Sequence, residues 1–240
     1  MSDGESREYL RHTKREPLFN LPAIVIALIG ICVALQLLQD YIMSPRSQLE
    51  LLIRGAFIPI RYSGYYIVDI YAFTTPVTYA FLHGGLTHLA VNMVWLAAVG
   101  TPLANRIGAL RFVIFWVVCA AAAAGLHYLL HPTDDTPLVG ASGAIAGMMA
   151  ATPRYLFRVN RYSDKPAYAG PLLPLITSLR SPQVLIFIVI WMGGNLLIGL
   201  LGTPGMSNSI AWEAHVGGFV AGFLLLGLFD RAPATISPYT

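Results

Sequence analysis

Two polar residues in apolar, glycine-rich sequence have the side chains that nucleophilic catalysis uses. Ser142 lies in a Gly-Ala-Ser-Gly sequence and His215 in an Ala-His-Val-Gly-Gly sequence. A serine hydroxyl becomes a nucleophile when an imidazole within hydrogen-bond reach takes its proton. Each residue also has a structural interpretation, because a small serine permits close helix packing and a histidine can bridge two helices.

A second polar group, His83, His88 and Asn92, stands at the start of another apolar run. His88 and Asn92 are four residues apart and therefore share one face of a helix. Two donors directed at a common point would stabilise the oxyanion that forms during acyl transfer. Zinc is the competing interpretation, but the sequence contains no HExxH motif and no carboxylate on that face, so we predict no metal there.

Glycines after the histidine indicate how it could reach the serine. Gly218 and Gly222 lie on roughly the His215 face of its helix, which leaves that face smooth enough for another helix to approach closely. The segment that carries the serine offers a matching surface at Gly143 and Gly147. We therefore expect these two segments to pack together, with the serine and the imidazole within hydrogen-bond reach.

The other polar residues near these motifs are predicted to have structural roles. Asn195, inside an apolar run, is expected to bridge helices. Glu213 precedes His215 by two residues, about 200° around the helix, so it cannot orient that ring and is expected at the outer rim. A solvated turn is expected for a further polar group, which consists of His127, His131, Asp134 and Asp135.

The composition places these residues in a membrane protein. Of the 240 residues, 56% are hydrophobic and only 11% are charged, whereas soluble domains carry about 25% charged residues. Disordered, collagen-like and disulfide-rich classes are also excluded, since aliphatic residues dominate and the two cysteines, Cys32 and Cys119, lie in apolar runs. The net charge of +3 is weak evidence for nucleic acid, so the predicted partner is the lipid bilayer and not a nucleic acid.

Six apolar runs divide the chain into a polar tail at 1–20, a membrane domain at 21–229 and a tail at 230–240. Open sheets cannot exist in lipid, so an all-α bundle is predicted. The runs are 21–39, 86–102, 112–130, 138–152, 184–201 and 210–229. Twelve of the 15 lysines and arginines fall on the side of the N-terminus, which predicts that both termini are cytoplasmic.

Two connections and one short run complete the predicted layout. The segment 40–81 mixes short apolar patches with tyrosines and arginines, as expected for an interfacial segment on the outer face. The basic connection 154–180 is expected to be solvated. The run 138–152 would span roughly 22 Å as a helix, less than the roughly 30 Å hydrocarbon core. Ser142 is therefore expected at a helix start below the outer surface, where free N–H groups favour an oxyanion.

Together, and in this order, the motifs resemble those of the rhomboid family of intramembrane serine proteases. The resemblance covers residues 21–229. It rests on H-x4-H-x3-N (His83, His88, Asn92), G-x-S-G (Gly140, Ser142, Gly143) and A-H-x-x-G-x-x-x-G (Ala214, His215, Gly218, Gly222). It implies a six-helix, multi-pass protein of the bacterial type, in a plasma membrane, that hydrolyses peptide bonds in or next to transmembrane segments of its substrates.

The resemblance also implies the roles of the site residues. Ser142 would be the nucleophile and His215 its base, a dyad without an acidic member, a cofactor or a metal. His88, Asn92 and the backbone N–H of Ser142 would form the oxyanion hole. The chain departs from the family pattern at Ala146, where an aromatic residue usually supports the histidine, at Ala104 in place of a glutamate, and in lacking a Trp-Arg pair within 41–80.

The alternative function is that of a rhomboid-like protein that binds or routes membrane clients without cleaving them. Relatives of this kind lack the catalytic residues. Because both members of the dyad are present here, Ser142 and His215, the sequence favours the protease.

Overall fold

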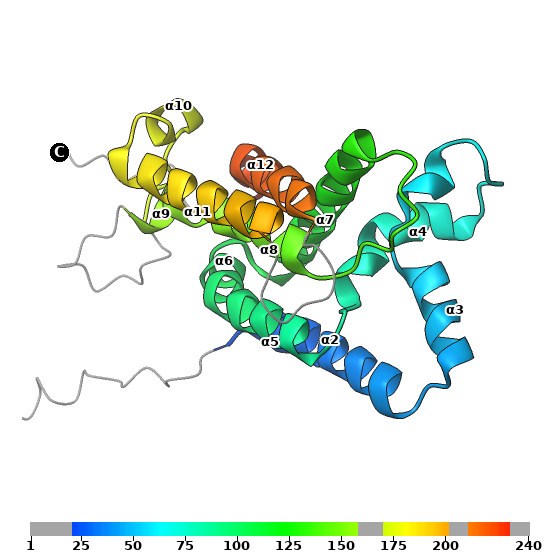
Figure 1. The fold of residues 1–240 in the computed structure, drawn as a ribbon. Helices are drawn as coiled ribbons and strands as arrows, with labels where there is room; N and C mark the ends of the chain where they lie inside the picture. The colour runs from blue at the N-terminus through cyan, green and yellow to red at the C-terminus, as the bar shows by residue number, and fades with distance from the viewer. Residues whose placement is uncertain (1–20, 158–169, 202–210, 231–240) are drawn as a thin grey trace, which may run out of the picture.

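The computed structural model of the protein describes residues 21–157, 170–201 and 211–230. The predicted tail at 1–20, the predicted tail at 230–240 apart from residue 230, and part of the basic connection lie outside these residues. The regular secondary structure of the described residues is helical apart from one isolated bridge between Phe57 and Leu138 (Figure 1), so the predicted all-α class is confirmed for them. The helices in the six predicted runs are α2 (Ala23–Tyr41), α5 (Leu86–Trp95), α7 (Ala109–Leu130), α8 (Ser142–Ala151), α11 (Pro182–Leu201) and α12 (Trp212–Phe229).

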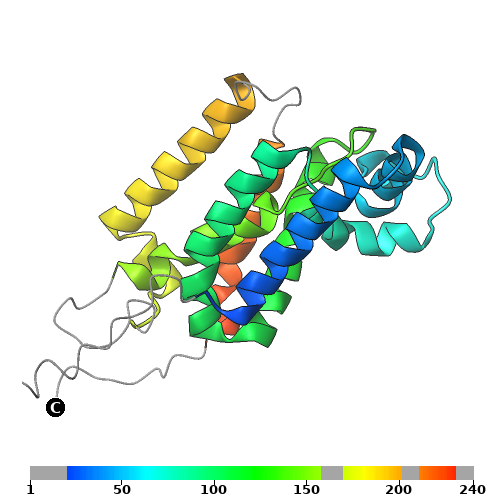
Figure 2. The ribbon, with the colours of Figure 1, turned by 90° about the horizontal axis from the view of Figure 1, so that it is seen from below.

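Among the described residues, four helical stretches are long and apolar enough to cross a membrane, namely Ala23–Tyr41, Leu86–Ile107, Ala109–Leu130 and Trp212–Phe229. The other two predicted spans are shorter in the described residues, because α8 has ten residues and α11 contributes the apolar stretch Pro182–Leu197. The fold is therefore a helical membrane bundle. Figure 2 shows α2 and α5 side by side and α11 at the edge of the bundle.

The second stretch continues past the proline at which its apolar run was predicted to end. A π-helical turn, Leu96–Gly100, joins α5 to α6 (Thr101–Ile107), and Pro102 occupies the first turn of α6. Proline is tolerated at that position because its missing N–H would have no partner in a new first turn. The helix ends instead at Gly108, whose φ of 81° is in the left-handed region that stops helices.

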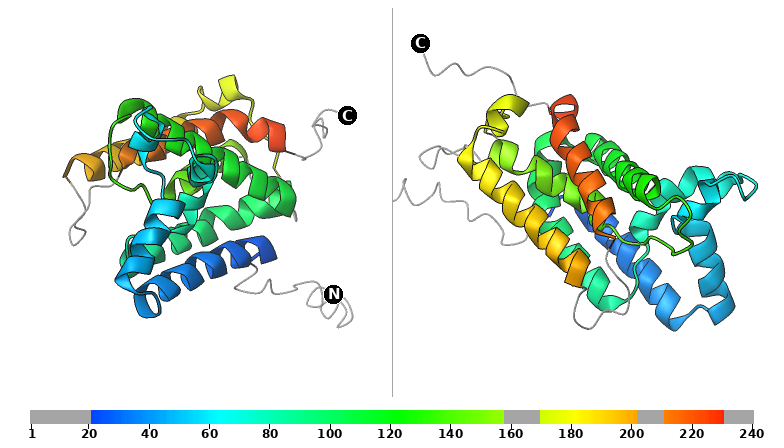
Figure 3. Two further views of the ribbon diagram at one scale, coloured as in Figure 1. Left: turned by 90° about the vertical axis from the view of Figure 1, so that its right-hand side faces the viewer. Right: turned by 45° about the horizontal axis from the view of Figure 1, so that its top comes forward.

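The central helix of the bundle is α8, whose residues from Gly143 to Ala151 are all buried. It packs against α7 and α12, and these three helices form the most extensive contacts in the described part of the chain. In Figure 3, α12 lies between α11 and α7. A helix that is apolar and small on every side belongs inside a protein. The helix that begins with Ser142 is consequently surrounded by other parts of the protein.

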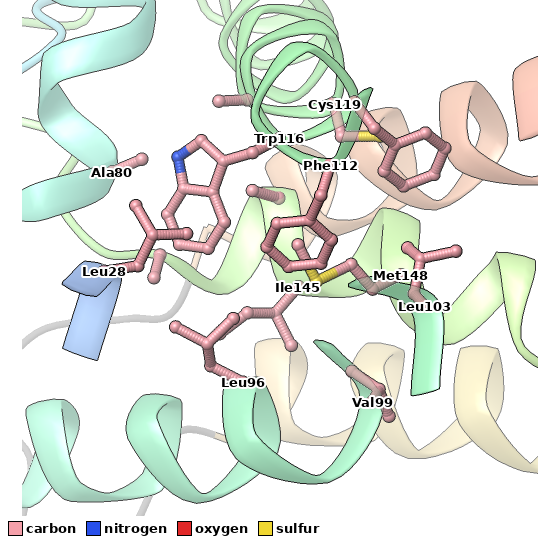
Figure 4. Packing of buried hydrophobic residues seen from close by; sticks show 14 of the residues in the cluster. Leu28, Ala80, Leu96, Val99, Leu103, Phe112, Trp116, Cys119, Ile145 and Met148 are labelled. Atoms are coloured by element: carbon pink, nitrogen blue, oxygen red, sulfur yellow. The ribbon is translucent and has the colours of Figure 1, made fainter. Parts of the chain in front are cut away.

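Large side chains from α7 fill the space between α8 and α5. Figure 4 shows Phe112 directed towards Ile145 and Met148, with Leu96 on the opposite side, and Trp116 directed towards Ala80 and Leu28. Phe112, Trp116, Leu96 and Met148 are almost completely buried. Both cysteines are free and buried, as expected for small hydrophobic residues. This packing fixes the depth and rotation of α8.

The segment between α2 and α5 folds into α3 (Pro45–Gly55), η1 (Pro59–Tyr62), α4 (Ile70–Thr78) and η2 (Tyr79–Phe81), which project to one side of the bundle (Figure 1). The Tyr62 hydroxyl donates to the Ala72 carbonyl oxygen, and its ring stacks on Phe57. Ile67 and Phe73 remain exposed. Exposed apolar side chains on α4 and on the loop before it fit the predicted interfacial position.

The expectation of a solvated connection after α8 is wrong at its first residue. Two short helices follow α8, α9 (Pro153–Leu156) and α10 (Leu175–Ser178). The side chain of Arg154 is buried, because its guanidinium donates to the carbonyl oxygens of Leu173 and Phe223. Beside it, Arg106 forms a bidentate salt bridge to Asp230, with nitrogen–oxygen distances of 2.9 and 2.7 Å. These buried cations close the end of the bundle away from Ser142.

Candidate active site

Ser142 and His215 meet at the opposite end of the bundle. Ser142 is the first residue of α8 and His215 lies in the first turn of α12. The Oγ of Ser142 is 2.7 Å from Nε2 of His215, a normal distance for a hydrogen bond in which a hydroxyl donates. The structure thus joins the two residues that the sequence separates by 73 positions.

Glycines make this contact possible. A Cβ added at Gly218 would overlap the carbonyl oxygen of Gly143, and one added at Gly222 would overlap that of Gly147. The backbones of α8 and α12 therefore touch along two turns, in register with the four-residue spacing on each helix. Glycine pairs with this spacing permit the closest helix packing in membranes. The structure therefore contains the close packing of these two helices that the glycine spacing predicted.

Asn195 holds the other side of the histidine ring, a contact that sequence reasoning missed. Its Oδ1 is 2.6 Å from Nδ1 of His215, and its Nδ2 donates to the carbonyl oxygen of Trp212 at 3.1 Å. Because a carbonyl oxygen only accepts, the amide group must present its oxygen to the histidine. Nδ1 of His215 is then the donor, and Nε2 keeps a free lone pair towards Ser142.

Asn195 does bridge α11 and α12, as predicted, and one of its two partners on α12 is the histidine. The sequence held one signal for this role: Asn195 is the only amide or ionisable residue in the apolar run 184–201. Polar residues in membrane helices are functional candidates by default. The partner of Asn195 could not be identified without knowing how α11 packs on α12.

His88 lies over Gly140, next to the serine. A Cβ at Gly140 would be 2.9 Å from Nε2 of His88 and 3.6 Å from Oγ of Ser142, and the φ of Gly140 is 122°. Gly84 N–H donates to Nδ1 of His88 at 3.3 Å. A neutral His88 therefore carries its proton on Nε2, the nitrogen on the side of the serine.

The remaining residues of the His83 motif have different contacts. The Nδ2 of Asn92 donates to the carbonyl oxygen of His88 at 2.9 Å, a hydrogen bond within α5. The ring of His83 packs edge-on against that of His88, with the centroids 5.3 Å apart. Burial, and then the proximity of His88, lowers the pKa of His83 to about 4. A neutral His83 at pH 7 adds no positive charge next to His88.

The start of α8 leaves backbone donors beside Ser142. Ile145 N–H donates to the carbonyl oxygen of Ala141, whereas Gly140 N–H, before the helix, donates to that of Tyr79. The first N–H groups of a helix have no partner within it and favour negative charge. Ser142 is thus placed where an oxyanion would be stabilised, as the short fourth run had indicated.

A cavity of about 280 Å³ opens beside His83. Its polar lining includes Gln36 and Asp40 of α2, which are hydrogen-bonded to each other, together with His83 and Thr136. A cavity of this size has room for water, and these polar side chains offer it hydrogen-bond partners. It lies against the Gly84–Gly85 turn that precedes His88.

One group of described residues has the ligand types and spacing for a metal ion, namely His127, His131 and Glu213. It does not include His88 or Asn92, the residues for which zinc was considered from the sequence. The predicted solvated turn is wrong for His127, which is buried. Glu213, expected at the outer rim, lies in the first turn of α12 and is hydrogen-bonded to His131. Helix α12 places Glu213 next to the two histidines at the end of α7.

The chain matches a family model described as the rhomboid domain over residues 71–231. Among the relatives, RHOMBOID-like protein 5 of Arabidopsis thaliana is 32% identical over 144 residues, which cover 60% of this chain and 40% of the relative. RHOMBOID-like protein 1 of the same plant is 31% identical over 65% of this chain and 34% of its own. The rhomboid protease GlpG of Serratia proteamaculans is 29% identical over 62% of this chain and 45% of its own.

The alignments cover less than half of the length of these curated relatives. The family model, in contrast, matches well over half of this chain, and its range contains the serine, the histidine and the glycines that pack α8 on α12. By this match, the chain belongs to the rhomboid family.

Proposed function

We propose that this protein is an intramembrane serine endopeptidase that hydrolyses peptide bonds in or next to transmembrane segments of membrane-protein substrates. The observation that carries the proposal is the hydrogen bond of 2.7 Å between Oγ of Ser142 and Nε2 of His215. The name of the Serratia relative, rhomboid protease, supports the same activity. A hydroxyl paired with an imidazole of the correct tautomer is the minimal unit of serine-based acyl transfer.

The proposed reaction follows from the two atoms in contact. Nε2 of His215 takes the hydroxyl proton as Oγ of Ser142 attacks the scissile carbonyl carbon, which forms a tetrahedral intermediate. The C–N bond then breaks, the proton passes from Nε2 to the leaving nitrogen, and an acyl-enzyme remains. Water, which the cavity beside His83 would supply, hydrolyses this ester by the same proton transfers in reverse.

Asn195 is proposed as the positioning residue of the histidine. Its oxygen accepts from Nδ1 of His215 while its amide nitrogen is held by the Trp212 carbonyl oxygen. This arrangement favours the tautomer that accepts the serine proton and fixes the plane of the ring. The role corresponds to that of the third residue of a triad, which orients the base. It would compensate for Ala146, which is too small to support the ring.

The oxyanion hole is proposed to consist of Nε2–H of His88 and backbone N–H groups at the start of α8. Both lie beside Ser142, and the hydrogen bond from Gly84 favours the His88 tautomer that donates. Donors placed where negative charge develops act mainly on the transition state. Asn92, also expected in the hole, donates one amide hydrogen to the His88 carbonyl oxygen, and its second amide hydrogen would be the one to join the hole.

The proposed setting is a multi-pass membrane protein with six crossings and both termini in the cytoplasm. The bundle has buried arginines, Arg106 and Arg154, at one end and the Ser142–His215 pair at the other. The positive-inside rule favours the arginine end as cytoplasmic. Substrate bonds would then be cut near the outer face, and a bacterial plasma membrane remains the predicted location.

Active-site labelling tests the proposal. Purified protein is treated with a fluorescent fluorophosphonate, which phosphonylates activated serines with loss of fluoride, and is assayed in liposomes on a transmembrane substrate. We expect labelling and cleavage, both lost in Ser142→Ala and in His215→Ala. The matched control is Ser181→Ala, a serine that hydrogen-bonds to Gln183 at the other end of α11 and should change neither. A folded protein that neither labels nor cleaves would contradict the proposal and favour the client-binding alternative.

A further inference from the structure

The last turn of α7 and the first turn of α12 bring two imidazoles and a carboxylate together, apart from the serine–histidine pair. His127 and His131 are one helical turn apart, with ring centroids 5.2 Å apart. Nε2 of His131 is 2.9 Å from Oε1 of Glu213. One potential ligand atom from each of the three residues lies within 4.8 Å of the other two.

The inner member of this group has an unused ring nitrogen. His127 is 7% exposed, and its Nδ1 is buried without a hydrogen-bond partner in the described part of the chain. A buried polar atom without a partner costs free energy, so such atoms call for an explanation. Packing alone does not require a histidine here, since an apolar residue of similar size would avoid that cost.

We propose that His127, His131 and Glu213 bind a divalent transition metal of the zinc class. Two imidazoles and one carboxylate are a common zinc ligand set, with bonds of about 2.0–2.2 Å and a fourth position left for water. Ligand atoms around such an ion are about 3–3.5 Å apart, so small side-chain rotations close the set. The ion would take the place of the proton now shared by His131 and Glu213.

Nearby charge supports a cation at this position. The carboxylate of Asp134 interacts electrostatically with both His127 and His131. Its Oδ1 accepts from the Thr136 N–H, which holds the carboxylate at this corner. The group therefore has two carboxylates and two imidazoles, which suits a dication better than an anion or a neutral ligand.

A metal ion here would act on α12 and not on the reacting atoms. Glu213 precedes His215 by two residues, and the ion would tie the first turn of α12 to the end of α7. The expected effect is a bundle that is harder to unfold, with the helix of the catalytic base fixed at its outer end. The site does not depend on the proposed proteolysis, and binding is measured without any substrate.

Cobalt binding tests the site directly. Ser142→Ala protein without a polyhistidine tag is freed of metal and titrated with Co²⁺, whose visible absorption reports tetrahedral nitrogen and oxygen ligands. We expect one Co²⁺ per chain, displaced by Zn²⁺. Glu213→Gln and His131→Ala should each weaken binding at least about 100-fold, since loss of even an outer-shell partner costs 10–100-fold. The matched control is Glu50→Gln, an exposed carboxylate on α3, with unchanged affinity.

Further variants separate this group from the catalytic histidines. His215→Ala should bind Co²⁺ as tightly as the parent, and Zn²⁺ should raise the melting temperature of the parent but not of Glu213→Gln. Glutamine keeps a hydrogen bond to His131, so this variant is expected to fold. The proposal is overturned if no stoichiometric Co²⁺ spectrum appears. It is also overturned if His215→Ala abolishes the spectrum while His131→Ala retains it.

Discussion

Replacing Gly218 by alanine tests whether the helix contact sets the activity. The added Cβ would overlap the carbonyl oxygen of Gly143, whereas ordinary contacts of a Cβ begin at 3.4 Å. Neither partner is a flexible side chain, so α8 and α12 must separate by about 1 Å or more. The Ser142–His215 distance, now 2.7 Å, would then exceed hydrogen-bond range.

The magnitude follows from this displacement. A misplacement of about 1 Å can cost roughly 10²-fold in rate, which corresponds to about 2.7 kcal/mol of transition-state stabilisation. Overpacking a tight interface also costs about 1–3 kcal/mol of stability, so folding and activity must be measured separately. The Gly218→Leu protein should still insert into the membrane but should be inactive.

The assay is kcat/KM for a transmembrane substrate in liposomes, with a thermal melt for each variant. The matched control is Gly227→Ala on the same helix, where an added Cβ would meet nothing within 4 Å. It should keep full activity. A folded Gly218→Ala protein with the activity of Gly227→Ala would refute the argument that this backbone contact holds the two residues together.

Three further outcomes are expected. Ser142→Ala and His215→Ala should each remove nearly all cleavage, and the double variant should be little slower, because the residues act as one unit; losses that multiply in kcat would contradict a shared step. Asn195→Ala should lower kcat by about 10–100-fold with KM unchanged, whereas Asn195→Asp, which keeps an acceptor for Nδ1, should retain more activity; equal kcat values for the two variants would exclude positioning. Asp230→Ala should lower the free energy of unfolding by about 3–5 kcal/mol, because it leaves the buried Arg106 without its carboxylate; a melting temperature unchanged from the parent would show that the pair contributes little.

The packing of α8 on α12 could be predicted because glycine spacing records it directly. Gly143, Gly147, Gly218 and Gly222 repeat at four residues on each helix. A Cβ at Gly218 or Gly222 would overlap the backbone of α8, and one at Gly143 or Gly147 would first meet side chains such as Ala123 and Cys119 of α7. The short α8 was likewise evident from the length of its apolar run. Both features depend on residues within one segment, through their spacing or the length of the run, so they can be recognised without knowing where other helices lie.

The contacts that could not be predicted depend on where a distant helix lies. Asn195 contacts His215 only because α11 packs on α12, and no spacing within either helix encodes that rotation. Arg154 looked like a solvated cation because its partners are backbone carbonyl oxygens of Leu173 and Phe223, which every residue has. His127 looked solvated for a similar reason, since the helix end that buries it comes from elsewhere in the chain.

The order of the helices has a consequence for the life of the protein in the cell. The nucleophile begins α8, but the base lies on α12, which the ribosome makes later. Under the proposed mechanism, a chain still being synthesised therefore holds a serine without its base. Such a chain would not cleave neighbouring membrane proteins, and the proposed activity would begin only after α12, with the catalytic histidine, has been inserted.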